Sequence, residues 1–89
     1  MANKRDLKKD INYSLGSLIE EVYLLETTQA NTKKEEVDAI VDDAIETFDS
    51  LMTKVNQKNV EKASTHFKGV RSDLKEAVAR ISKRIEALR

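Results

Sequence analysis

The sequence predicts an all-α protein, a three-helix antiparallel bundle with up-down-up order and a long C-terminal helix. Of the 89 residues, 36% are charged and 39% hydrophobic, with two glycines and no proline, a composition that favours long helices. Apolar residues recur every three or four positions in three successive segments, which is the helical period. Short polar stretches separate these segments, so consecutive helices must reverse direction. A chain of this length is expected to form one domain, residues 1–89.

The first helix is predicted at about residues 4–26. Asn3 stands where an N-cap belongs, and Asp6 places an acid at the positive end of the helix dipole. The helical stripe of this segment consists of Leu7, Ile11, Leu15, Leu18, Val22 and Leu25.

Four basic residues near the start raise a second interpretation, a basic arm that binds a polyanion. They are Lys4, Arg5, Lys8 and Lys9. At 100° per residue, Lys4 and Lys8 fall on a different side of the helix from Arg5 and Lys9. The segment 1–32 also carries four bases against five acids, whereas a phosphate-binding arm concentrates positive charge on one face. We therefore interpret the segment as the solvated start of a helix.

The second helix is predicted at about residues 33–56. It follows Thr32 and Glu35, whose spacing matches a capping box. Its apolar residues cover an arc of about 140° and are Val37, Ile40, Val41, Ala44, Ile45, Phe48, Leu51, Met52 and Val55.

The third helix is predicted at about residues 60–88, with Asn59 as its cap. Gly69 could divide it into two helices, but Phe67, Val70 and Leu74 keep their helical phase across the glycine. One interior glycine costs only about 1 kcal/mol, so a continuous helix is expected. The stripe consists of Val60, Ala63, Phe67, Val70, Leu74, Ala77, Ile81, Ile85 and Leu88, with Val78 beside its later part.

Two sets of apolar residues are candidates for an interaction surface. The third helix is predicted to be longer than the other two, about 42 Å, so that Ile81, Ile85 and Leu88 would project uncovered beyond its neighbours. Such an overhang predicts a homodimer. Tyr13 and Leu24 lie on the first helix opposite its apolar stripe, with Tyr23 near that edge, and these three residues form the second candidate surface.

No catalytic arrangement is evident. The chain has no cysteine, no phosphate-binding glycine loop and no His-Glu-x-x-His motif. His66, the only histidine, could act as a base or a pH sensor, but no acid three or four residues before it orients the ring. It is interpreted as a packing residue at the boundary of the core. We therefore expect no enzyme and no cofactor.

An acidic ridge on the second helix could in principle hold a cation. Its residues are Asp38, Asp42, Glu46 and Asp49. Calcium requires six to eight converging oxygens, and metal sites in helical bundles use inward carboxylates with paired histidines. The ridge has neither feature, so a solvated face is expected and no metal site.

Charge is distributed unevenly along the chain. Residues 33–55 carry three bases and seven acids, whereas residues 56–89 carry nine bases and four acids. One explanation is attraction between neighbouring antiparallel helices of opposite charge. The alternative is a nucleic-acid-associated accessory protein that uses the basic C-terminal helix, although aromatic platforms for bases are missing.

No apolar run exceeds the four residues 22–25, far fewer than the roughly 18 to 20 that a membrane span needs. The sequence therefore predicts a cytoplasmic protein without a membrane partner.

The opening MANKRDLKKDINY resembles that of a family of short all-helical cytoplasmic proteins of unknown function from Bacteroidales. The resemblance extends more weakly to the third helix, at Phe67 and Lys68. It implies a compact helical bundle and supplies no catalytic residue. Together with the residue patterns, it leads us to expect a small non-enzymatic structural or protein–protein interaction module that self-associates or binds another protein.

Overall fold

Three long helices make up most of the described structure. The computed structural model describes residues 4–29, 31–57 and 61–89. Helix α1 spans Lys4–Thr28, α2 spans Lys34–Val55 and α3 spans Ala63–Leu88. No strand occurs in these residues. The all-α class is therefore confirmed, and the predicted helix limits agree with those observed to within three residues.

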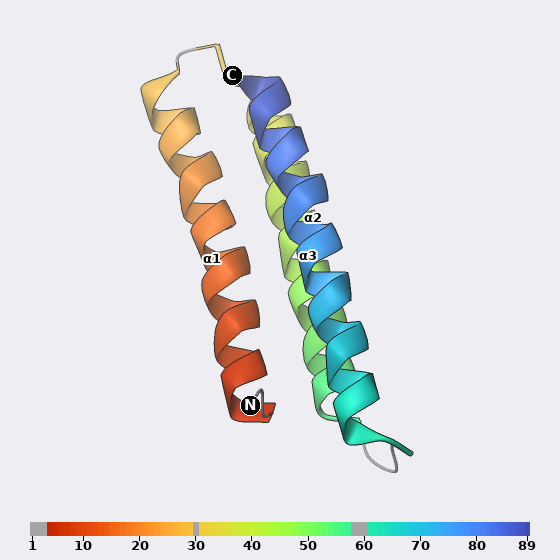
Figure 1. The fold of residues 1–89 in the computed structure, drawn as a ribbon. Coiled ribbons are helices and arrows are strands. Elements are labelled where there is room, and N and C mark those ends of the chain that lie inside the picture. Colours follow the sequence, from red (N-terminus) through yellow and green to blue (C-terminus); the bar gives the residue numbers. More distant parts are fainter. Residues whose placement is uncertain (1–3, 30, 58–60) are drawn as a thin grey trace.

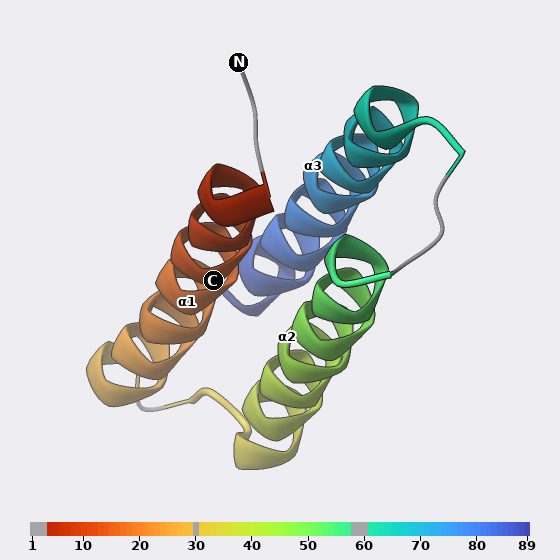
Figure 2. The same cartoon turned by 90° about the horizontal axis from the view of Figure 1, so that it is seen from below.

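The helices run up, down and up, as predicted (Figure 1). Seen along the bundle, they stand at the corners of a triangle (Figure 2). The molecule is elongated, with extents of 49 × 21 × 17 Å. The C-terminal end of α3 therefore lies at the same end of the bundle as the α1–α2 connection (Figure 1).

The core is a single apolar cluster to which all three helices contribute. Its α1 members are the six residues of the predicted stripe, all at most 6% exposed. The remaining buried members are Val37, Ile40, Val41, Ala44, Leu51 and Val55 of α2, and Val70, Leu74, Ile81 and Ile85 of α3. Most of the stability of a helix in a protein comes from packing of its apolar face, so burial of these stripes against one another stabilises each helix.

The predicted capping box at the start of α2 is wrong. Lys33, in extended conformation, is the N-cap residue and makes no side-chain cap bond. The Thr32 hydroxyl is buried and has no hydrogen-bond partner among the described atoms. Because the helix begins one residue later than the motif implies, the Lys33 carbonyl, not the Thr32 side chain, meets the first turn, accepting from the backbone N–H groups of Glu36 and Val37.

Helix α3 continues through Gly69 without interruption, as predicted. Gly69 is exposed, and a Cβ at this position would have no neighbour within 4 Å. No packing constraint therefore acts on the residue, and its helical phase is held by the buried side chains of Val70 and Leu74. The caps predicted at Asn3 and Asn59 lie outside the described residues.

Candidate interaction surfaces

The predicted overhang of α3 is absent. Ile81 and Ile85 are completely buried, and Leu88 is partly buried against the core. The cause is length, because α3 has 26 residues and α1 has 25, so that the two helices match. The Gln29 side-chain amide also donates to the Leu88 carbonyl at 3.1 Å, which ties the end of α3 to the α1–α2 connection. These three residues therefore form no exposed surface.

The other predicted candidates are exposed, as expected. Tyr13 is 77%, Leu24 64% and Tyr23 46% accessible to solvent. The structure adds Ile45 of α2, which is 47% exposed although the sequence placed it in the core stripe. The sequence held one indication that an apolar residue of α2 would be exposed, which is the width of its apolar arc. An arc of about 140° extends past the surface that two neighbouring helices cover.

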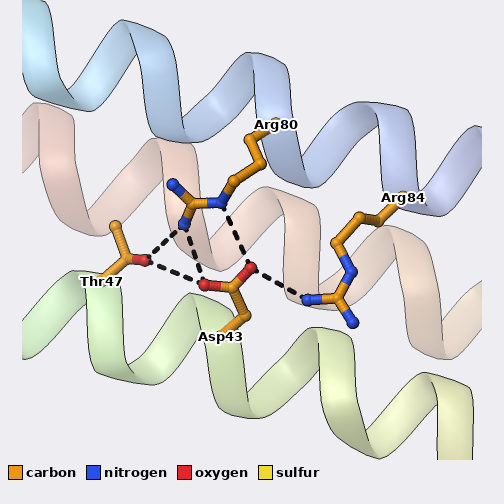
Figure 3. Close-up of polar contacts among 4 residues, drawn as sticks. All are labelled: Asp43, Thr47, Arg80 and Arg84. Carbon is orange, nitrogen blue, oxygen red and sulfur yellow. Dashed lines mark hydrogen bonds and ion pairs between the residues drawn. The ribbon is translucent and has the colours of Figure 1, made fainter.

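A carboxylate on α2 joins that helix to α3 through two arginines (Figure 3). Arg80 donates to one oxygen of Asp43 at 2.9 Å, and Arg84 donates to the other at 3.0 Å. Arg80 also donates to the Thr47 hydroxyl at 3.1 Å. Burial of Asp43 by itself raises the pKa of its carboxyl, but the hydrogen bonds from Arg80 and Arg84 and their positive charges outweigh burial and hold that pKa below its usual value.

Further ion pairs connect α3 and the residue after it to both other helices. Arg71 contacts Asp10 of α1 at 2.9 Å, and Arg89 contacts Glu21 of α1 at 2.7 Å. Lys54 of α2 contacts Asp73 at 2.9 Å. The predicted attraction between α2 and α3 is thus present, although this last pair has the reverse polarity.

The seam between α1 and α2 differs from the α1–α3 and α2–α3 seams, which these ion pairs bridge. Within the described ranges, no ion pair joins α1 to α2. Instead, an open hollow of about 590 Å³ lies at the end of this seam where α1 begins. Its lining combines bases with half-buried apolar side chains and consists of Lys4, Arg5, Lys8, Lys9, Asn12, Phe48 and Met52.

The four basic residues are therefore not spread around α1, and that expectation is wrong. Their spacing of one, three and one confines them to an arc of about 140° at 100° per residue. The arc faces the α2 side, so all four residues line one hollow. The sequence analysis placed Lys4 and Lys8 on a different side of the helix from Arg5 and Lys9, although an arc of this width can face a single neighbouring helix.

His66, which sits in the first turn of α3, contacts the last turn of α2. Its Nε2 lies 2.5 Å from the Lys54 carbonyl oxygen. A carbonyl can only accept, so Nε2 carries the proton and donates to a carbonyl in the last turn of α2, which also accepts from the backbone N–H of Gln57. The ring is also tilted against Phe67, with 5.7 Å between centroids. These contacts agree with the predicted packing role.

The acidic ridge of α2 is exposed along its whole length. No group of three or more metal-ligating side chains that could hold an ion occurs among the residues that the structure describes. None of the described helices is both long and apolar enough to cross a membrane.

Comparison with protein-family models, with curated proteins and with solved structures gave no match to this chain. The resemblance of the opening segment to the Bacteroidales family stays a prediction. The surfaces described above are consequently the basis for any functional conclusion.

Proposed function

We propose that this chain is a small non-enzymatic protein–protein interaction module that contacts its partner through the outer surface of the α1–α2 pair. One observation carries the proposal. An open hollow at the α1–α2 seam combines four bases with the half-buried Phe48 and Met52, and the exposed Ile45 lies two turns before Met52 on the same side of α2. Apolar side chains bordered by charge are the usual composition of a protein interface. As part of this proposal, the module acts in the cytoplasm, as the family resemblance also implies.

The ion pairs of α3 argue against the alternative, a nucleic-acid-associated protein that uses the basic C-terminal helix. Arg71, Arg80 and Arg84 of this helix each contact a carboxylate of another helix. Such side chains would have to leave these contacts before they could bind phosphate. The remaining positive charge on α3 is not accompanied by exposed aromatic rings on that helix, on which bases could stack.

Site-specific photo-crosslinking distinguishes these functions. A photoreactive amino acid replaces Ile45 in one variant and Leu24 in a matched control, and both are expressed in the native cell. We expect protein adducts from position 45 and markedly fewer from position 24. Absence of adducts at position 45, or adducts with nucleic acid, would overturn the proposal.

Binding of labelled DNA and RNA gives an independent check. The proposal predicts essentially no binding at moderate salt. Tight binding that weakens steeply as salt rises is the behaviour expected of phosphate contacts and would favour the nucleic-acid function instead.

A further inference from the structure

We infer that the partner of the α1–α2 surface is a second copy of this chain, bound antiparallel across that surface; the inference rests on the function proposed above. Figure 2 shows α3 packed on one side of the α1–α2 pair, while no described helix covers the opposite side. We call this opposite side the α1–α2 face. Its apolar residues are spread along its length, from Phe48 and Met52 at the hollow, through Ile45, to Ile19 and Tyr23 on the later half of α1.

Helical geometry places the residues of α1 on this face. Arg5 and Lys8 line the hollow beside α2, and Tyr23 and Glu26 follow them by 18 residues, which is five turns. Tyr23 and Glu26 therefore point from α1 in the same directions as Arg5 and Lys8. On α2, Asp38 and Met52 lie seven residues before and after Ile45, and so share its side of the helix.

The two ends of the face carry opposite charge. At the end where α1 begins, the four bases of the hollow are opposed by one acid among the described residues of this face, Asp49. In the half of the face where α2 begins, Lys34 opposes four acids among the described residues, which are Glu20, Glu26, Asp38 and, nearer the middle, Asp42. Each end thus has an excess of three charges, positive at one and negative at the other. No ion pair between described residues involves the four bases or the four acids, so these charges are available to a partner.

The middle of the face suits a twofold axis. Asn12 and Phe48 line the same hollow, so in antiparallel helices Gly16, four residues further along α1, is level with Ala44 and Ile45. Gly16 is the central residue of α1, and Ile45 lies at the middle of α2. A Cβ on Gly16 would have nothing within 4 Å, so the chain itself does not require a glycine there. In the dimer this gap gives the Ile45 region of the partner room to approach.

Charge complementarity indicates that the partner is a second copy of this chain and that the two copies are antiparallel. An antiparallel pair related by a twofold axis through the middle places each basic end over an acidic end, twice. A parallel pair would place like charges together. The face runs along a molecule 49 Å long, which gives a twofold contact the length over which both oppositely charged ends can meet their partners.

Sedimentation equilibrium of the full chain tests the inference. We expect the monomer to convert to a dimer as the protein concentration is raised to about 1 mM. Ile45→Glu should raise the dissociation constant about 30-fold or more, because it places a charge at the centre of the contact. Leu24→Glu is the matched control, since it replaces another exposed apolar residue off the face, and it should leave the dimer unchanged. Circular dichroism checks that both variants are folded.

Charge reversal tests the direction of the pairing. Lys8→Glu with Lys9→Glu should weaken the dimer about tenfold. Addition of Glu20→Lys and Asp38→Lys to the same chain makes the two ends opposite in charge again, with an excess of one charge at each end instead of three, so the dissociation constant should recover part of the tenfold loss. Failure of this rescue would contradict the antiparallel arrangement.

The outcomes separate this inference from the proposed function. A chain that is monomeric at about 1 mM, or a dimer that Ile45→Glu leaves intact, overturns the inference. If position 45 then crosslinks to a different protein, the proposed function stands without self-association. Nucleic-acid adducts at that position would overturn both.

Discussion

At the scale of single residues, Asp43 is the carboxylate that makes the most ion pairs between described helices. Its carboxylate accepts from two arginines on the neighbouring helix and is only 23% exposed. A pair this close adds modest stability, and it favours the observed rotation of α2 against α3, in which both arginines reach the same carboxylate.

The lowered pKa of Asp43 leads to a pH-dependent prediction. Its stabilisation is present above the unfolded-state pKa, about 3.9, and is lost as the pH falls through the lower pKa of the folded state. Asp43→Asn should therefore reduce the free energy of unfolding by about 1 kcal/mol at pH 7, and the difference from the original chain should shrink toward pH 2. Urea denaturation at several pH values measures both quantities.

Asp49→Asn is the control for this experiment. Asp49 is an exposed carboxylate of the same helix without an ion pair to another described residue. Its replacement should change the free energy of unfolding by less than about 0.5 kcal/mol. A difference between the original chain and Asp43→Asn that stays constant down to pH 2 would contradict the assigned ion pairs.

At the scale of helices, the location of Ile81 is the most informative difference from the sequence-based expectation. Its side chain is fully buried, whereas an overhanging α3 would leave it in water. Ile81→Ala should therefore lower the free energy of unfolding by about 2 to 4 kcal/mol through the cavity it creates. Ile81→Val provides a milder version, with a loss of about 1 kcal/mol.

Leu24→Ala is the matched exposed substitution. Leu24 is 64% exposed, so its loss should cost less than about 0.5 kcal/mol. Thermal and chemical denaturation of these variants compare the two positions directly. Equal, small effects at positions 24 and 81 would mean that the end of α3 is not packed as described.

The periodicity of apolar residues was sufficient to predict three helices, their order and most of the core, including the continuous passage of α3 through Gly69. It did not predict their relative lengths. The end of α1 and the start of α3 differ by two and three residues from the expected positions. Because of this difference, Ile81 and Ile85 were predicted to project beyond the other helices, whereas both are buried in the core. Helix ends depend on local caps, as the unused capping residue Thr32 illustrates.

The candidate site was predicted only in part. Tyr23 was found because its exposed position follows from the phase of α1 alone. The contributions of Ile45, Phe48 and Met52 could not be found in this way, because they depend on which edge of a wide apolar arc the neighbouring helices leave uncovered. Likewise, the hollow is lined by residues about 40 positions apart in the sequence, at the start of α1 and on α2. The periodicity of either helix alone therefore does not predict it.

At the scale of the whole molecule, the three seams of the bundle have different properties. The two seams that involve α3 are bridged by ion pairs. The α1–α2 seam carries exposed apolar side chains and opposite charge at its two ends. We infer that α3 stabilises the monomer and that the α1–α2 face mediates association.

Backbone amide chemical shifts, measured by NMR over a dilution series of the full chain, test this central claim most directly. The account predicts concentration-dependent shifts at Tyr23, Ile45, Phe48 and their neighbours on the α1–α2 face, while amides near Arg80 on α3 stay constant. Shifts concentrated on α3, or no shifts up to about 1 mM, would contradict it.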